Sequence, residues 1–178
     1  MNESVRGTED GSKLRLVLLP GMDGTGELFA SFLNVLPAWI QPEVVRYSSR
    51  EHLSYTDVLS SVRSALPKSE RFVLLAESFS TPIAIRLAAE APSNLKALVI
   101  CAGFIESPIN GLARVWVSLL APILLQFSPP AFAIRTLLVG KDASVELVRS
   151  TRAAISSVSP GVLLGRLRMC FSVTKQRG

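Results

Sequence analysis

Hydrophobic positions along the chain fall into two patterns, short continuous runs and longer segments with helical spacing. The runs are typical of strands buried on both faces, and the spaced segments are typical of helices with one buried face. Strands are expected at 14–19, 42–47, 72–76 and 95–101. Helices are expected between them at 28–36, 58–66 and 81–91, and a proline ends each of the first two.

This alternation predicts an α/β fold with a doubly wound, mostly parallel sheet of about four strands, because helices supply the crossovers that parallel neighbours need. Right-handed crossovers on both faces give the spatial order 42–47, 14–19, 72–76, 95–101. The winding then reverses between the two central strands. Ligands bind beyond the carboxyl ends of strands at such a reversal. The expected site therefore lies in the loops PGMDGTG and ESFS, which follow these strands.

Beyond residue 104 the pattern is helical only, with segments expected at 109–127, 130–139, 145–158 and 160–173. We expect residues 14–104 to form the core, 105–173 to form a helical lid, 1–13 to be a disordered arm and 174–178 a loose tail. The apolar stretch 115–127 is shorter than the roughly 20 residues that span a bilayer and contains Pro122. A helix over a core or pocket is favoured over stable membrane insertion, with a membrane-surface anchor at 112–127 as a remote alternative.

The composition supports one domain, since 48% of the 178 residues are hydrophobic. Lys and Arg number 19 against 14 Asp and Glu, a net charge of +5. Much of the excess lies late in the chain, at Arg149, Arg152, Arg166, Arg168, Lys175 and Arg177. These residues are expected on solvated helix faces, and binding to nucleic acid is not expected because no recognition module accompanies them.

Two cysteines, Cys101 and Cys170, lie in apolar segments without motif spacing. We expect buried thiols, no metal site and a reducing, cytoplasmic location. The polar start MNESVRGTEDGSK has no apolar region typical of a secretory signal.

A serine stands at the joint between the third expected strand and its helix. Such a tight turn presents the hydroxyl of Ser78 at the sheet edge and requires small residues two before and two after it, here Ala76 and Ser80. The usual G-x-S-x-G pattern has glycine at both positions, so this is a relaxed form. Ser78 is therefore a candidate nucleophile, and the alternative is a serine that caps the following helix.

Backbone donors are expected beside this serine. The turn brings the N–H of Phe79 to a helix N-terminus, where it can stabilise an oxyanion. The glycine-rich loop supplies a second donor, the Met22 N–H, after the Pro20-Gly21 corner. The loop matches neither common nucleotide-binding pattern, so no cofactor is expected.

Nearby acidic residues have competing interpretations. Glu77 either orients loop groups or is solvated, with the second slightly favoured. Asp23 is expected to brace its own loop rather than serve as a catalytic acid, and capping explains Asp142 better than an acid role.

Three stretches, LVLLPGMDGTGELF, VLLAESFSTPIAIRLAAE and LKALVICAGF, resemble the α/β-hydrolase superfamily, particularly bacterial hydrolases with P-G-[LM]-D-G-T-G and A-E-S-F-S. The resemblance covers about 14–173. It implies a cofactor-free serine hydrolase of carboxylic esters or thioesters, with Ser78 as nucleophile, Met22 and Phe79 as oxyanion donors and a lid over the site. The apolar lid favours a small-molecule substrate with an apolar acyl group.

The catalytic acid and histidine that such chemistry needs are not found after the lid. The single histidine, His52, precedes Ser78; an exposed loop position is favoured over an unusual base. We expect a C-terminally incomplete chain of doubtful activity, with an exposed sheet edge that allows self-association. The alternative function is a catalytically inactive binding or interaction fragment.

Overall fold

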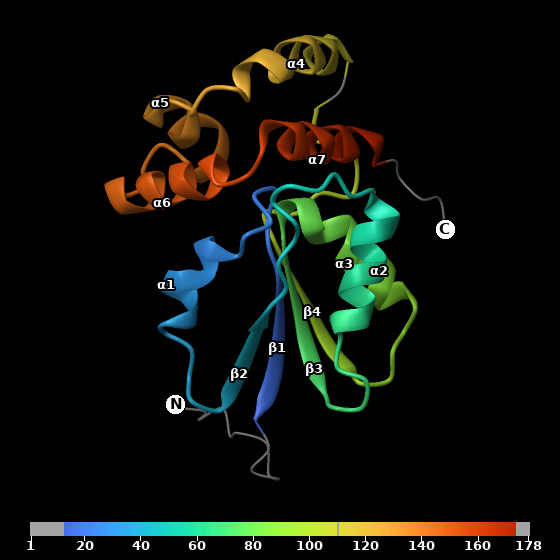
Figure 1. Cartoon of the computed structure of the whole chain (residues 1–178). Helices are drawn as coiled ribbons and strands as arrows, with labels where there is room; N and C mark the ends of the chain where they lie inside the picture. The colour runs from blue at the N-terminus through green and yellow to red at the C-terminus, as the bar shows by residue number, and fades with distance from the viewer. Residues whose placement is uncertain (1–12, 110, 174–178) are drawn as a thin grey trace.

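The structure, a computed structural model, describes residues 13–109 and 111–173. The predicted tail at 174–178 and the predicted arm, apart from Lys13, lie outside these residues. The elements are β1 (Leu14–Leu19), η1 (Glu27–Phe29), α1 (Ala30–Leu33), β2 (Ile40–Val44), α2 (Tyr55–Ala65), β3 (Phe72–Glu77), η2 (Ser78–Ser80), α3 (Thr81–Ala89), β4 (Leu95–Cys101), α4 (Gly111–Leu124), α5 (Ala131–Ile134), η3 (Arg135–Val139), α6 (Val145–Ser156) and α7 (Pro160–Ser172) (Figure 1).

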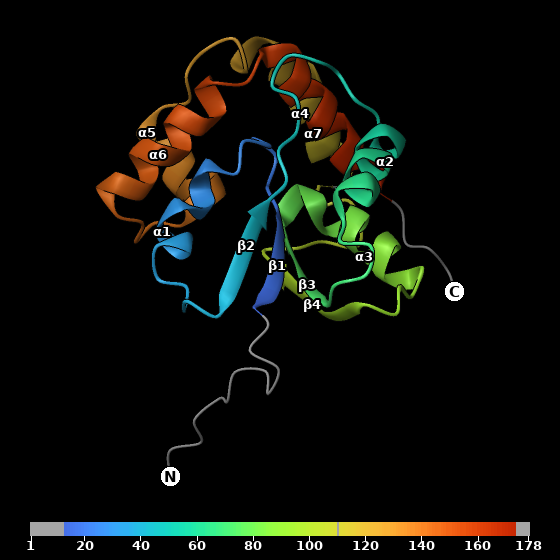
Figure 2. The ribbon, with the colours of Figure 1, turned by 60° about the horizontal axis from the view of Figure 1, so that its bottom comes forward.

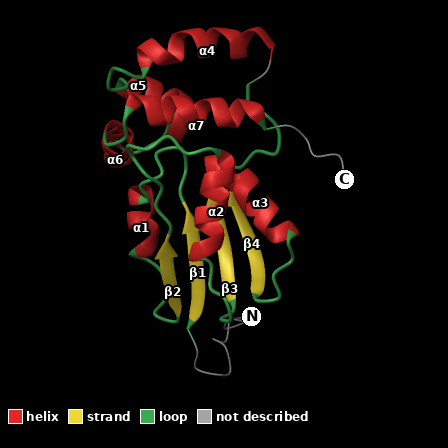
Figure 3. Cartoon of the chain, turned by 45° about the vertical axis from the view of Figure 1, so that its right-hand side comes forward, coloured by secondary structure: helices red, strands yellow, loops and turns green. Residues whose placement is uncertain are grey.

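The sheet is parallel and has the order β2-β1-β3-β4, which confirms the predicted fold class and strand order. Leu18 of β1 pairs with Val44 of β2 on one side and with Leu75 of β3 on the other. Figure 3 shows all four arrowheads pointing toward the helices α4–α7. The carboxyl ends of the strands therefore lie under this helical layer.

Alternating side chains of the strands bury the two faces of the sheet against different helices. On one face, Val17 and Leu19 of β1 belong to the cluster that includes side chains of α2 and α3. On the other face, Leu16 and Leu18 pack with Phe29 of η1. Figure 1 accordingly shows α1 on one side of the sheet and α2 with α3 on the other.

The second strand and the first helix depart from the sequence prediction. The second strand lies at Ile40–Val44 rather than 42–47, because its pairing with β1 begins at Leu14 and Ile40. It tolerates Pro42 because β2 is an edge strand. The helix expected at 28–36 is divided into the short η1 and α1, which ends at Leu33.

Burial differs from expectation at one of the two cysteines. Cys170 is buried, as predicted, but Cys101 is exposed. Cys101 ends β4, the other edge strand, and no strand of the described chain covers its outer side. The expectation for Cys101 was wrong because an apolar run shows strand character but not the strand's position in the sheet.

The helices α4–α7 form a layer over the carboxyl ends of the strands, and α4 packs against α7 (Figures 1 and 2). Serine hydroxyls cap α6 and α7, since Ser144 accepts from Leu147 N–H and Ser159 from Val162 N–H. Much of the apolar surface of α4 is exposed, at Leu112, Val115, Trp116, Leu119, Leu120, Ile123 and Leu124. No helix in the described part of the chain is long and apolar enough to cross a bilayer.

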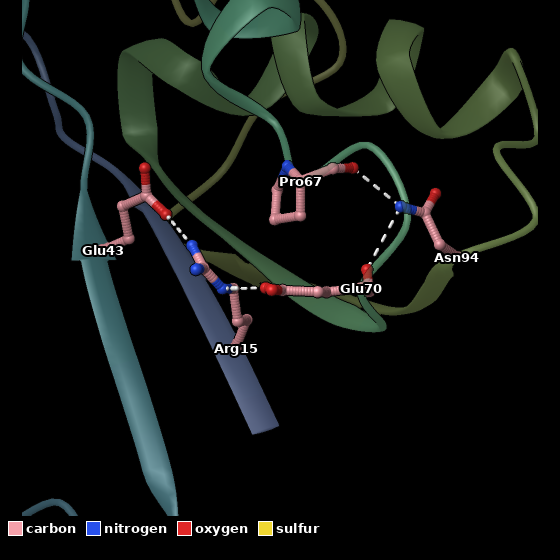
Figure 4. A network of polar contacts seen from close by, with 5 residues as sticks. All are labelled: Arg15, Glu43, Pro67, Glu70 and Asn94. Carbon is pink, nitrogen blue, oxygen red and sulfur yellow. Dashed lines mark hydrogen bonds and ion pairs between the residues drawn. The ribbon is translucent and has the colours of Figure 1, made fainter. Parts of the chain in front are cut away.

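A polar network joins the strands at the opposite, amino-terminal end of the sheet (Figure 4). Arg15 of β1 forms ion pairs with Glu43 of β2, at 2.9 Å, and with Glu70 before β3. The Asn94 side chain donates to the carbonyl oxygens of Pro67, at 2.7 Å, and Glu70, at 3.1 Å. These contacts tie loops together far from the expected site and are structural.

Candidate active site

The joint between β3 and α3 has the constrained backbone expected of the serine turn. Ser78 directly follows β3 and has φ +44, an unusual value for a residue with a side chain. Ala76 and Ser80, two positions before and after it, are both fully buried. Strain of this kind persists only where the surrounding packing enforces it, which makes the turn a candidate functional feature.

The helix-capping alternative for Ser78 finds no support in the contacts. Ser80, not Ser78, is the N-cap residue of α3, and no side chain makes a capping hydrogen bond there. Within the described residues, the Ser78 hydroxyl makes no hydrogen bond. This half-buried hydroxyl is therefore not committed to the local structure.

Ser80, which stands where the usual pattern has glycine, has a defined place for its hydroxyl. The hydroxyl donates to the carbonyl oxygen of Pro20, at the end of β1. The phenolic oxygen of Tyr47 lies 2.6 Å from Ser80 Oγ, and since the Ser80 proton is already used, Tyr47 is the donor. A serine is accommodated here because its hydroxyl links the turn to the segments that follow β1 and β2.

Phe79 anchors the turn in the core. Its fully buried ring stacks on Tyr55 at 5.3 Å between centroids and meets Tyr47 edge to face at 6.0 Å. Burial raises the pKa of both tyrosines above the ordinary value, so both phenols are protonated at neutral pH. The packing fixes the backbone of Phe79, whose N–H is one of the two proposed oxyanion donors.

The loop after β1 is held through its carbonyl groups. Gly24 N–H donates to Gly21 O at 3.1 Å, and Tyr47 N–H donates to Gly24 O at 2.8 Å. The Asp23 carboxylate accepts from the N–H and hydroxyl of Thr25, which confirms that Asp23 braces its own loop. No hydrogen bond among the described residues uses the Met22 N–H as donor.

Glu77 lies between the two loops rather than in solvent. Its half-buried carboxylate lies beside the Gly21 backbone, where a Cβ built on Gly21 would come 3.2 Å from Oε1. Burial, together with the nearby Asp23, raises the pKa of Glu77 above its ordinary value. The favoured interpretation of Glu77 as a solvated residue was therefore wrong, and the alternative, that it orients loop groups, fits its contacts.

Arg166 of α7 was missed as a site residue and was expected on a solvated face. Only 3% of it is exposed. Its guanidinium donates to the carbonyl oxygens of Met22, Asp23 and Ser48. No local pattern marks this arginine, because its acceptors lie more than a hundred residues away along the chain. Of the other late basic residues, Lys175 and Arg177 lie outside the described residues, while Arg149, Arg152 and Arg168 are exposed as expected.

The candidate general bases and acids are not assembled around Ser78. His52 is exposed, as favoured, and its ring lies against α7, where a Cβ on Gly165 would come within 2.0 Å of Nε2. Asp142 is exposed in the turn before α6, whose cap is Ser144, so the capping explanation for Asp142 was wrong. No group of metal-binding side chains occurs among the described residues.

A pocket of about 460 Å³ opens between α2, α3 and the end of α7. Its wall is mainly apolar and includes Leu59, Ile83, Ile85 and Ile105. Neither Ser78 nor Met22 lines it, so this pocket does not bring a ligand to the serine turn.

The fold is similar to the folds of several solved structures. A carboxylesterase of the thaumarchaeon Nitrososphaera gargenis superposes with a TM-score of 0.71 at 12% identity, over 94% of this chain and 67% of that one. The bottromycin epimerase BotH superposes at 0.65 with 18% identity, over 89% and 64%. An α/β hydrolase fold protein from Nakamurella multipartita superposes at 0.58 with 16% identity, over 93% and 70%.

The chain therefore has the α/β-hydrolase fold. It spans about two thirds of the length of these neighbours. No protein-family model and no curated protein matches it. The fold is thus shared with esterases and hydrolases, and also with an epimerase, so the fold by itself does not select a reaction.

Proposed function

We propose that the chain is a serine hydrolase of the α/β-hydrolase type that acts on carboxylic esters or thioesters, with Ser78 as nucleophile. The observation that carries this proposal is the strained backbone of Ser78, at φ +44, between two fully buried small residues. This geometry presents a hydroxyl without a local hydrogen bond at the carboxyl edge of the sheet.

In the proposed reaction, Ser78 Oγ attacks the acyl carbon, and the Met22 and Phe79 N–H groups stabilise the negative charge on the carbonyl oxygen. The alcohol or thiol then leaves with a proton, and water hydrolyses the acyl-enzyme. Burial of Phe79 and the bonded carbonyls of the loop after β1 support both donors, since each fixes the backbone that carries the N–H.

The reaction needs a group that accepts the Ser78 proton, and no such group is hydrogen-bonded to Ser78 in the described structure. The sole histidine, His52, lies against Gly165 and makes no hydrogen bond to Ser78 in the described structure. Loss of the base typically lowers turnover by about 10⁴–10⁶. This favours, as a second candidate, a catalytically inactive hydrolase-like protein that binds or interacts with a ligand at the same edge.

Residues 14–104 would form the hydrolase core and 105–173 a lid. The lid assignment is supported by the position of α4–α7 over the strand ends (Figure 2). We also propose a small-molecule substrate with an apolar acyl group, which the apolar helices of the lid would accommodate, and no cofactor.

Location and self-association are part of the same proposal. Two free cysteines, one of them exposed, favour a reducing, cytoplasmic environment. Self-association would use β4, an edge strand with Val99 40% and Ile100 45% exposed.

Covalent labelling with a fluorophosphonate, followed by mass spectrometry of the modified peptide, tests the nucleophile. We expect modification at Ser78, lost in Ser78→Ala and retained in Ser61→Ala, which changes an exposed serine of α2. A short-chain chromogenic ester should show turnover that Ser78→Ala abolishes. Labelling is the sharper readout because it needs one attack rather than a full cycle.

The enzyme proposal would be overturned, in favour of the binding protein, if protein that circular dichroism shows to be folded gave neither labelling at Ser78 nor turnover. Loss of labelling in His52→Ala would instead identify His52 as the base.

A further inference from the structure

The guanidinium of Arg166 reaches from α7 to the loops that follow β1 and β2. One of its terminal nitrogens, Nη1, donates to Met22 O at 2.9 Å and to Asp23 O at 2.7 Å. The other, Nη2, donates to Ser48 O at 2.7 Å. The acceptors belong to the loops that follow β1 and β2, so one side chain of the helical layer joins two strand ends.

The surroundings of the guanidinium are built to hold it. It lies over the rings of Tyr47, at 5.7 Å, and Phe79, at 6.0 Å. Gly24 leaves room for it, since a Cβ there would lie 2.5 Å from Nη1, and the φ of +70 at Gly24 itself disfavours a side chain. A cation with only 3% exposure is thus surrounded by carbonyl oxygens and aromatic rings.

These contacts fix a run of consecutive peptide groups. The carbonyls of Met22 and Asp23 are bound by Arg166, and the carbonyls on either side are bound by the N–H groups of Gly24 and Tyr47. The Gly21 carbonyl and the Met22 N–H belong to one trans peptide group and point in opposite directions. Fixing the loop carbonyls therefore also fixes the direction of the Met22 N–H.

We propose that Arg166 is a positioning residue that holds the loop after β1 in the conformation that directs the Met22 N–H toward the reaction at Ser78. This rests on the proposed function. Because Arg166 comes from α7, the geometry of the donor depends on the docking of this helix on the sheet. Lysine cannot replace it, since a single ammonium group does not reproduce the planar, five-donor fork.

Hydrogen exchange read by mass spectrometry tests the role directly. In Arg166→Lys and Arg166→Ala, we expect amides of residues 21–26 to exchange at least about 10-fold faster, because their fixed conformation is lost. The labelling rate of Ser78 should fall by about 10-fold or more, toward the 10²–10³ typical of a lost oxyanion donor. The matched control is Arg168→Ala, an exposed arginine of the same helix, which should change neither rate.

Chemical rescue separates positioning from general stability. Millimolar methylguanidinium should restore loop protection and labelling in Arg166→Ala, whereas methylammonium should not. If either variant fails to fold, exchange of the unsubstituted protein in increasing urea decides instead. The amides of 21–26 should then open together with those of α7.

The role of Arg166 would be overturned if folded Arg166→Lys kept the loop exchange and the labelling rate of the unsubstituted protein. It would also be overturned if, in the unsubstituted protein, the loop opened independently of α7. Failure of the unsubstituted protein to label at Ser78 would overturn the proposed function. Loop exchange is measured without any reaction, so the two failures are distinguishable.

Discussion

The Ser80 hydroxyl oxygen lies 2.6 Å from the phenolic oxygen of Tyr47, and both groups are buried. The Ser80 proton goes to the carbonyl oxygen of Pro20. Ser80 is therefore connected to the segments that follow β1 and β2. A glycine at position 80 could not make these bonds, which explains how this turn departs from the G-x-S-x-G pattern and is still held in place.

Substitution of this serine should destabilise the fold. Ser80→Ala leaves the buried Tyr47 hydroxyl without its acceptor, at a cost of about 1–3 kcal/mol in the free energy of unfolding. Urea unfolding of Ser80→Ala, Tyr47→Phe and the double variant measures the cost and the coupling. Strict additivity of the two single effects would contradict the proposed bond, and the exposed Ser61→Ala should stay within about 0.5 kcal/mol of the unsubstituted protein.

Glu77 should make stability depend on pH. Because burial raises the pKa of Glu77 in the folded protein, the folded state binds this proton more readily than the unfolded chain. The free energy of unfolding should therefore rise as pH falls from the raised pKa toward the ordinary value of 4.5, and the contribution is lost above the raised pKa. Urea unfolding from neutral pH downward should show a smaller slope of the free energy of unfolding against pH in Glu77→Gln than in the unsubstituted protein. An unchanged slope would show that Glu77 titrates alike in both states.

Two glycines should respond oppositely to alanine. Gly26 has φ +74, and a Cβ there would lie 2.3 Å from Val44 Cγ1, so Gly26→Ala should cost at least about 2 kcal/mol through backbone strain and overpacking. Gly161 of α7 is the matched control, since a Cβ there meets nothing within 4 Å. Thermal unfolding should show Gly161→Ala unchanged or more stable, and equal effects at both positions would contradict the described loop.

A charge on the outer strand should reduce association of the chain with itself. Val99 of β4 is 40% exposed and pairs with Leu75 of β3 on its inner side. Val99→Lys places a charge on this edge, where natural sheets use lysine to prevent strand pairing. Sedimentation velocity over a range of concentrations, in reducing buffer because Cys101 is exposed, should show a larger monomer fraction.

The control for the edge is Val35→Lys, which charges a more exposed valine, at 76%, beyond α1. It should leave the association unchanged. If both lysine variants raise the monomer fraction equally, the effect reflects net charge rather than the edge of β4.

Local patterns in the sequence sufficed to predict four strands and their order in the sheet. The bounds of β1 and β4 were predicted correctly because each is an apolar run ended by a change in composition. The alternation with helices then fixed the parallel order through the handedness of crossovers. The turn at Ser78 was recognisable for the same reason, since its small neighbours are adjacent in sequence.

Contacts between distant segments decided the rest. The position of β2 depended on its pairing with β1, and the exposure of Cys101 depended on β4 being an edge. The burial of Arg166 could not be predicted, because in sequence Arg166 looks the same as the other basic residues of the late helices, which were expected on solvated faces. Tertiary structure brings that residue to three carbonyl oxygens from loops 118 to 144 positions earlier, and desolvating an arginine is tolerable only where such acceptors are already assembled. The sequence by itself determined the sheet and the serine turn, and only the tertiary structure determined what holds the loop beside that serine.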